Sequence, residues 1–127
     1  MIDHVSVAVA DLEASTTFYE AVLAPLGLNL FIAGDDRAGF GKKYPEFWIN
    51  LREGVAKAPD DTGIHICLRA RSIEAVDAFH AAALAGGGRC DGPPGERQAT
   101  ITRYYGAFIR DLDGNKLEAV TFLEAVL

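Results

Sequence analysis

The sequence predicts an α+β fold built from two tandem βαβββ modules. Three observations support this prediction: a histidine in a short alternating apolar run occurs twice, each run leads directly into a helix start, and short strands follow each helix. A shift of 61 residues places His65 on His4 and Ser72 on Asp11. An internal repeat of this length, with the same order of elements in both copies, indicates a duplicated structural unit.

The chain has 127 residues, which is the usual size of a single domain with its own hydrophobic core. We therefore expect one domain over residues 1–127. Within it we expect module one at about residues 1–54, an exposed linker at residues 55–62 and module two at about residues 63–127.

The charge and composition exclude several classes of partner. A net charge of −6 with scattered Lys and Arg residues argues against binding to nucleic acid or to an anionic membrane, because both need basic patches. No apolar run is long enough to span a membrane, and the first residues do not resemble a signal peptide. We therefore expect a cytoplasmic protein, with Cys67 and Cys90 as reduced thiols because they form no CxxC motif.

Module one is expected to begin with a strand and a helix. Residues 2–10 alternate, with three valines on one face and His4 on the other, as in a strand with one apolar face. Asp11 is expected to cap the following helix, which ends at Pro25 and Gly27. Three short strands then follow, at residues 28–32, 38–41 and 47–51.

Module two repeats this order from Gly63 onward. Ser72 is expected to cap a helix at about residues 73–84, and the glycines at 86–88 to end it, so that they form no phosphate-binding loop. Strands are expected near Cys90, at residues 100–104, at 105–110 and at 116–122. Residues 111–115 are expected to form a tight hairpin turn instead of a calcium loop, because the glycine is misplaced for calcium.

The offset between the modules grows to 68 residues at their ends. This offset pairs Phe40 with Phe108 and Asn50 with Glu118. We expect the seven extra residues of module two to form a loop around Pro93, Pro94 and Gly95.

Four repeat-equivalent positions converge if the two sheets form one concave surface: His4, Asn50, His65 and Glu118. Two imidazoles and a carboxylate can hold Fe(II), Mn, Co, Ni or Zn and leave positions open for substrate or water. Asn50 is expected to be a weak oxygen ligand or a neighbour of the ligands. The alternation of side chains points both histidines away from the face that packs against the helix.

Structural roles are the ordinary alternative for each of these residues. Glu118 stands between apolar neighbours and needs a partner, which a metal or Arg110 can supply. Trp48 lines the pocket or packs in the core. Either Tyr104 or Tyr105 is expected to act near the metal as an acid or oxyanion donor, with sheet packing as the alternative.

Two further side chains are expected to be structural. Cys67 shares a face with His65 but is expected to be a small buried filler and not a ligand. His80 falls within the second helical run, where it is expected to lie on the surface or pack against the helix.

Residues 103–120, taken together with the two strand histidines, resemble the vicinal oxygen chelate superfamily of glyoxalase I, bleomycin resistance proteins and extradiol dioxygenases. The opening residues His4 to Val7, followed by residues 11–15 and by Phe18 and Tyr19, are similar to the first module of that family. The resemblance spans essentially the whole chain.

The resemblance implies paired modules whose mixed sheet forms a cup with flanking helices, commonly in a homodimer. It also implies a divalent metal held by His4, His65 and Glu118, which binds two neighbouring oxygens of a small-molecule substrate, with Glu118 in the catalytic set. Asn50 departs from the family pattern, because the position is similar to a glutamate ligand in glyoxalase I and an amide cannot act as a base. The ligand set suits dioxygenases, epimerases and fosfomycin-type transferases better than a lactoylglutathione lyase.

Three hypotheses follow for the function. The first is a metal-dependent lyase or isomerase, or a dioxygenase-like enzyme. The second is a metal-free protein that sequesters a small hydrophobic or cationic molecule, as bleomycin resistance proteins do. The third is a structural dimerisation module without a ligand.

Overall fold

The computed structural model describes the backbone of residues 1–124 and the side chains of residues 1–123, and it confirms the two tandem βαβββ modules. Module one consists of β1 (Val5–Val9), α1 (Leu12–Leu23), the short 3-10 helix η1 (Ala24–Leu26), β2 (Asn29–Ala33), β3 (Arg37–Gly41) and β4 (Pro45–Leu51). Module two consists of β5 (Ile66–Arg69), α2 (Ile73–Ala85), β6 (Arg89–Gln98), β7 (Arg103–Arg110) and β8 (Lys116–Glu124).

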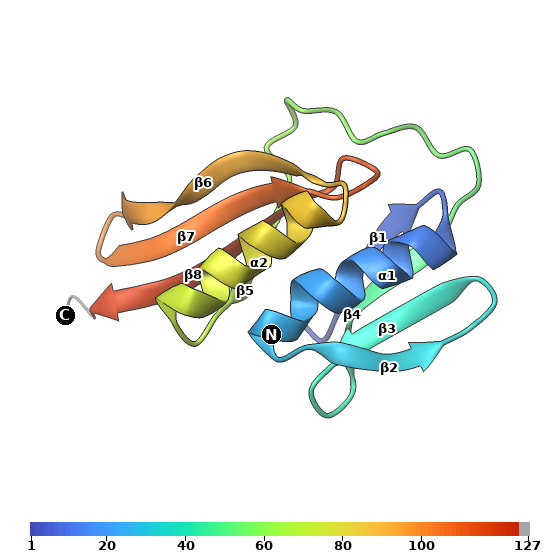
Figure 1. The fold of residues 1–127 in the computed structure, drawn as a ribbon, viewed down its shortest axis with the longest axis horizontal. Coiled ribbons are helices and arrows are strands. Elements are labelled where there is room, and N and C mark those ends of the chain that lie inside the picture. Colours follow the sequence, from blue (N-terminus) through green and yellow to red (C-terminus); the bar gives the residue numbers. More distant parts are fainter. Residues whose placement is uncertain (125–127) are drawn as a thin grey trace.

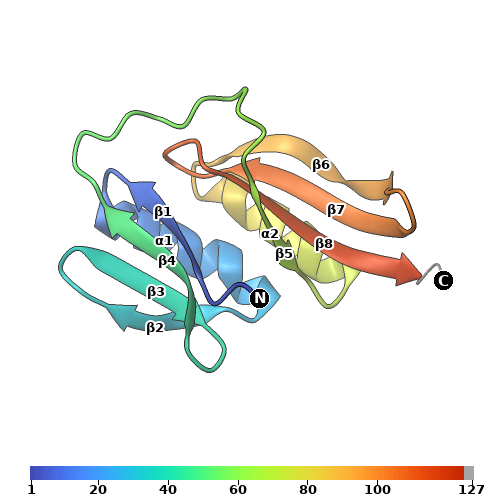
Figure 2. The ribbon, with the colours of Figure 1, turned by 180° about the vertical axis from the view of Figure 1, so that it is seen from behind.

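The described strands form two separate mixed sheets, with strand orders β1-β4-β3-β2 and β5-β8-β7-β6. In each sheet the first strand pairs in parallel with the last strand of the module, and the other pairs are antiparallel. The two sheets lie side by side, and one helix covers the same face of each (Figures 1 and 2). We call the uncovered face of each sheet its open face.

The predicted helix starts are confirmed in both modules. The Asp11 carboxylate accepts a hydrogen bond from the Ala14 N–H at 3.0 Å, and the Ser72 hydroxyl accepts one from the Ala75 N–H at 3.1 Å. Each cap satisfies a backbone donor that the helix itself cannot satisfy. Gly27 ends η1 with a φ of 78°, which favours glycine.

The hydrophobic core lies between the helices and the covered faces of the sheets. α1 and α2 contact each other, so the core is continuous across the modules. Its largest fully buried apolar side chains come from both modules: Tyr19, Phe40, Phe47, Phe79, Leu23, Ile49, Ile109 and Leu117.

Three predicted boundaries were wrong. β6 runs from Arg89 to Gln98, through the segment that we expected to be a loop. Its register shifts twice, and it is the edge strand of its sheet, where prolines and bulges are tolerated. The strands expected at 100–104 and 105–110 are one strand, β7. Both β1 and β5 begin one residue after their histidine, so neither His4 nor His65 lies within a strand.

A buried hydrogen bond joins the modules. The Tyr19 hydroxyl in α1 donates to the Asp111 carboxylate at 2.5 Å, and Asp111 belongs to the turn between β7 and β8. Burial raises the pKa of the Asp111 carboxyl above its usual value, and the hydrogen bonds from Tyr19 and Asn115 lower it again in part. Burial and the Asp111 charge also raise the pKa of Tyr19, which therefore remains a hydrogen-bond donor.

The same turn is docked on the end of β1 by two further hydrogen bonds. The Asn115 side-chain amide donates to the Ala8 carbonyl at 3.0 Å, and the Ala10 N–H donates to the Asp113 carboxylate at 3.0 Å. Within the turn, the Asp111 N–H donates to the Asn115 carbonyl at 2.9 Å, and β7 and β8 on either side pair antiparallel, which confirms the predicted hairpin turn. The turn also forms part of the contact between modules.

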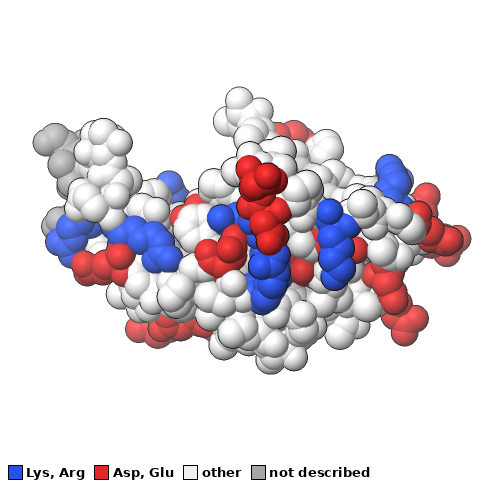
Figure 3. All heavy atoms as spheres, turned by 90° about the horizontal axis from the view of Figure 1, so that it is seen from above, with Lys and Arg blue, Asp and Glu red and all other residues white. Residues whose placement is uncertain are grey.

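Charged side chains of both signs are interspersed over the face drawn in Figure 3. None of the helices in the described part of the chain is long and apolar enough to cross a membrane.

We predict that Tyr19→Phe lowers the free energy of unfolding by about 1.5–3 kcal/mol, because it removes a hydrogen bond to a buried carboxylate. Urea denaturation measures this change. Tyr44→Phe is the matched control, because Tyr44 is 49% exposed and should change stability by less than about 0.5 kcal/mol. Equal midpoints for the two variants would contradict the assignment.

Candidate functional site

His65 and Glu118 meet on the open face of module two. The Nε2 atom of His65 lies 3.1 Å from Oε1 of Glu118. Glu118 lies in β8 directly opposite Cys67 of β5, and it is only 5% exposed. A carboxylate so deeply buried needs a charged or hydrogen-bonding partner.

The second ring nitrogen of His65 indicates which atom is available to a ligand. Nδ1 lies 3.2 Å from the Gly63 carbonyl, a contact that is favourable when Nδ1 carries the hydrogen. In the neutral ring, Nε2 then presents a lone pair toward the Glu118 carboxylate, which can only accept. Two acceptors facing each other require a proton or a cation between them.

The same two atoms fit a metal ion. Zinc and similar ions bind imidazole nitrogen and carboxylate oxygen at about 2.0–2.2 Å. Two such ligands at a right angle lie about 3 Å apart. A histidine that binds a metal usually donates its other N–H to a carbonyl or carboxylate, and the Gly63 carbonyl lies 3.2 Å from Nδ1 of His65, where it can accept that hydrogen.

His4 lies on the same cavity as His65. Its Nδ1 lies 2.7 Å from the Asp3 carboxylate, so the neutral ring also leaves Nε2 as the acceptor. The cavity has a volume of about 360 Å³ and is lined by Ile2, Asp3, His4, Val5, Glu46, His65, Ile66, Cys67 and Leu68. The structure thus brings both predicted histidines to one cavity, and Glu118 contacts one of them.

Asn50 lies on β4 of module one and is not among the residues that line this cavity. Its amide donates a hydrogen bond to the Ser6 hydroxyl, which leaves its carbonyl oxygen available as a neutral donor. Within the described residues, no three His, Cys, Asp or Glu side chains form a group that could hold a metal ion. The chain itself therefore assembles the His65 and Glu118 pair, with His4 nearby.

The two candidate tyrosines lie on opposite faces of β7. Tyr105 donates a hydrogen bond to Asp77 of α2 at 2.7 Å, so it lies on the helix face. Tyr104 pairs with Phe122 of β8, and both lie on the same face of the sheet as the Phe108 and Glu118 pair, which is the open face. Burial raises the pKa of Tyr104, and the nearby Glu118 carboxylate raises it further.

The prediction that Cys67 is a buried filler was wrong. Cys67 is exposed and lies on the open face beside Glu118, because Ile66 and Leu68 take the positions that face the core. Its thiol is still partly enclosed, and this burial together with the Glu118 charge raises the pKa of Cys67 to about 12.

Sequence reasoning missed Phe108 and Arg97 as parts of the site. The Phe108 ring meets the His65 ring edge-on, with centroids 5.5 Å apart, and the Arg97 guanidinium lies 5.5 Å from the Phe108 centroid. The repeat offset equates Phe108 with Phe40, but Phe40 is fully buried in the core. The strand pairing explains why the two phenylalanines lie in different places. Phe108 of β7 pairs with Glu118, whereas the residue of β3 that pairs with Asn50 is Arg37 and not Phe40.

Trp48 also lies on an open face, in module one. It is half-buried, and the Arg37 guanidinium lies 5.3 Å from its ring centroid. Of the two roles considered for Trp48, this position favours the lining of a surface site over a place in the core.

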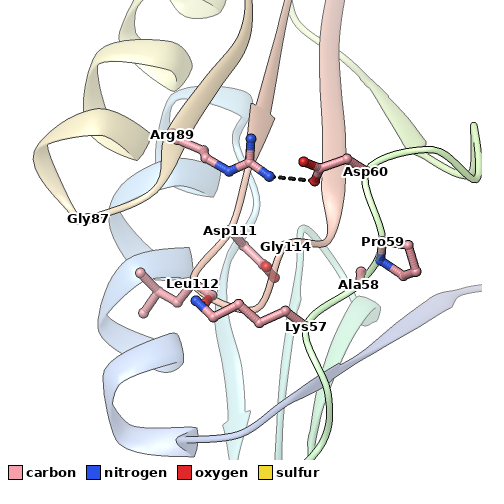
Figure 4. A pocket seen from close by; sticks show the side chains of 9 residues that line it. All are labelled: Lys57, Ala58, Pro59, Asp60, Gly87, Arg89, Asp111, Leu112 and Gly114. Carbon is pink, nitrogen blue, oxygen red and sulfur yellow. Dashed lines mark hydrogen bonds and ion pairs between the residues drawn. The ribbon is translucent and has the colours of Figure 1, made fainter.

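A larger cavity of about 570 Å³ lies at the linker (Figure 4). Its charged groups are already engaged: Arg89 pairs with Asp60 at 2.5 Å, and the Lys57 ammonium donates to the Leu112 carbonyl at 3.1 Å. Neither His65 nor Glu118 lines it. We assign no chemistry to this cavity.

The chain is similar to known proteins over nearly its whole length. Residues 1–119 match the model of the Glyoxalase/Bleomycin resistance protein/Dioxygenase superfamily. A search of curated proteins found no match.

Solved structures resemble the fold over nearly the whole chain. A glyoxalase/bleomycin resistance protein from Albidiferax ferrireducens is 39% identical, with a TM-score of 0.80 over 93% of this chain and 96% of that one. A glyoxalase/bleomycin resistance protein/dioxygenase family enzyme from Burkholderia phytofirmans is 18% identical, with a TM-score of 0.71 over 96% of this chain and 98% of that one. A glyoxalase I mutant from Zea mays is 23% identical, with a TM-score of 0.71 over 92% of this chain and 44% of that one.

We predict that Cys67 alkylation by iodoacetamide, in protein kept free of metal by a chelator, rises about tenfold per pH unit up to pH 10. The thiolate is the reactive form, and a pKa of about 12 keeps its fraction far from saturation over that range. Mass spectrometry of the Cys67 peptide measures the rate. Urea-unfolded protein is the control and should level off near pH 9–10, since an unperturbed cysteine has a pKa of about 8.5. A plateau near pH 9 in the folded protein would contradict this placement of the thiol.

Proposed function

The chain belongs to the glyoxalase/bleomycin resistance protein/dioxygenase superfamily, and from this premise we propose that it is a divalent-metal-dependent enzyme acting on a small molecule. The observation that supports this proposal most strongly is the contact between Nε2 of His65 and the buried Glu118 carboxylate at 3.1 Å. The donor types and their separation suit Fe, Mn, Ni, Co or Zn.

In this proposal His65, Glu118 and His4 hold the metal, and the Asn50 carbonyl oxygen is a weak additional donor. A divalent ion bound there supplies Lewis-acid chemistry, which stabilises negative charge on two adjacent substrate oxygens. His4 and His65 line one cavity, which supports a site formed within one chain. A homodimer, as is common in the family, can then carry one such site in each copy.

The surrounding side chains have distinct roles. Tyr104 stays protonated at neutral pH because its pKa is raised, so its hydroxyl can donate to an oxygen that becomes negative. Asn50 cannot accept a proton as a carboxylate does, so Glu118 is the remaining candidate base. The presence of a carboxylate in module two and an amide at the equivalent position of module one favours a dioxygenase-like or isomerase reaction over one that needs a carboxylate from each module. Tyr105 has no part in this proposal, because it bonds to Asp77 on the helix face.

A metal-free small-molecule binding protein of the bleomycin resistance type is the second candidate. It is favoured by the half-buried rings of Trp48 and Phe108 on the open faces, since aromatic rings line many ligand sites. A ligand whose affinity is unchanged by a chelator and by His65→Ala would support this candidate over the metalloenzyme.

We predict that protein purified without a chelator binds about one equivalent of a divalent transition metal per chain. His65→Ala and Glu118→Gln should each weaken binding by at least about tenfold, because loss of even a hydrogen-bond partner of a ligand costs about 10- to 100-fold in metal affinity. His80→Gln is the control, because His80 lies on α2 behind the sheet and should leave metal binding unchanged. Elemental analysis and calorimetry measure both quantities. A metal content below a tenth of an equivalent, unaffected by His65→Ala, would overturn the proposal.

We predict that mixing His4→Ala and His65→Ala chains does not restore metal binding. In a site formed within one chain, each copy in the mixture still lacks a ligand. The two variants are unfolded and refolded together, and the metal content of the product is compared with that of each variant alone. If binding recovers in a mixed dimer, one histidine comes from each copy and the site forms between chains.

A further inference from the structure

Arg97 is a cation on the open face of module two that no carboxylate neutralises within the described residues. It takes part in none of the ion pairs formed there. Arg97 is half-buried, and its guanidinium lies over the Phe108 ring, which His65 and the Lys116 ammonium also contact. Arg97 and His65 therefore contact the same aromatic side chain.

Backbone carbonyls hold this guanidinium in place. Nη1 donates to the carbonyls of Gly95 and Gly106 at 3.2 and 3.1 Å, and Nη2 donates to the carbonyl of Pro93 at 3.0 Å. The register shifts of β6 fall between Cys90 and Gly95, next to two of these carbonyls. The bulged segment of β6 thus positions Arg97.

Glycines provide the space that the guanidinium occupies beside the sheet. A Cβ atom at Gly92 would lie 3.1 Å from Nη2 of Arg97 and 3.0 Å from Cδ2 of Phe108. Gly95 and Gly106 are paired in the next row of the sheet, and neither has a side chain to cover the arginine. Arg97 itself pairs with Tyr104, and its side chain can therefore extend past the Gly95 and Gly106 pair toward Phe108 and Glu118.

Two of the five N–H groups of Arg97 have no acceptor among the described residues, because only three hydrogen bonds are formed. Nε–H and the second N–H of Nη2 remain. Two parallel donors of a guanidinium match the two oxygens of a carboxylate. A phosphate group presents three strong acceptor oxygens, which is more than these two donors can satisfy, so the pair fits a carboxylate better.

We propose that Arg97 binds a carboxylate group of the substrate, so that the substrate is a small carboxylic acid that also carries two adjacent oxygens. The part of this inference that concerns the two adjacent oxygens rests on the function proposed above. The carboxylate contact rests on Arg97 and its surroundings. Phe108 lies between the two points of attachment, because both Arg97 and His65 contact its ring, and the Lys116 ammonium lies 4.7 Å from the ring centroid.

The test titrates metal-free protein, in the presence of a chelator, with benzoate and with the neutral analogue benzamide. Benzoate should shift the NMR signal of the Arg97 Nε–H group, assigned by its loss in Arg97→Lys, and benzamide should not. Arg97→Gln should weaken benzoate binding at least tenfold. Arg97→Lys keeps the charge but loses the paired donors, and should weaken it at least threefold.

Arg89→Gln is the matched control, because it removes the same charge from β6 at an exposed ion pair with Asp60. It should leave benzoate affinity within twofold of wild type. If Arg97→Gln fails to fold, the wild-type NMR shift and Arg97→Lys decide. An Arg97 Nε–H signal that does not move, or equal benzoate affinity in wild type and Arg97→Lys, would overturn the proposal. Because no metal is present, this result is independent of whether His65 and Glu118 bind one.

Discussion

The buried Asp111 carboxylate is the constraint on which the rest of the structure depends. Its charge is expensive to bury, and the cost is offset by the Tyr19 hydroxyl, the Asn115 side chain and two backbone N–H groups. Tyr19 belongs to module one and the turn to module two, so the bond between Tyr19 and Asp111 orients the modules. β8 leaves that turn directly, and Glu118 lies in its first residues. The position of Glu118 therefore follows from the contact between modules.

The duplicated fold carries two unequal sets of side chains on its open faces. Module two presents His65, Glu118 and Arg97, whereas the equivalent part of module one pairs Asn50 with Ser6. An amide bonded to a hydroxyl is neutral and weakly coordinating, so in the proposed site a cation would be held mainly by module two, with His4 contributed from just before the start of β1.

Much of the fold could be predicted because local signals agree with the tertiary structure. The caps at Asp11 and Ser72 and the repeated histidine runs need no distant partner to be recognised. The sequence predicted that His65 and Glu118 converge with His4 and Asn50. It did not predict which of these side chains are in contact, because the offset of the repeat does not specify it. Arg97 and Phe108 could not be found in this way, because they depend on the register shifts of β6 and on the pairing of β7 with β8. The same pairing decides that Tyr104, and not Tyr105, lies beside Glu118.

The central claim is that His65 and Glu118 hold a divalent metal together. Its most direct test is a crystal structure of metal-loaded protein with anomalous diffraction measured at the absorption edge of the metal. The account predicts one strong peak within about 2.0–2.2 Å of both His65 Nε2 and a Glu118 carboxylate oxygen. A peak elsewhere, or a direct hydrogen bond between His65 and Glu118 at saturating metal, would contradict it.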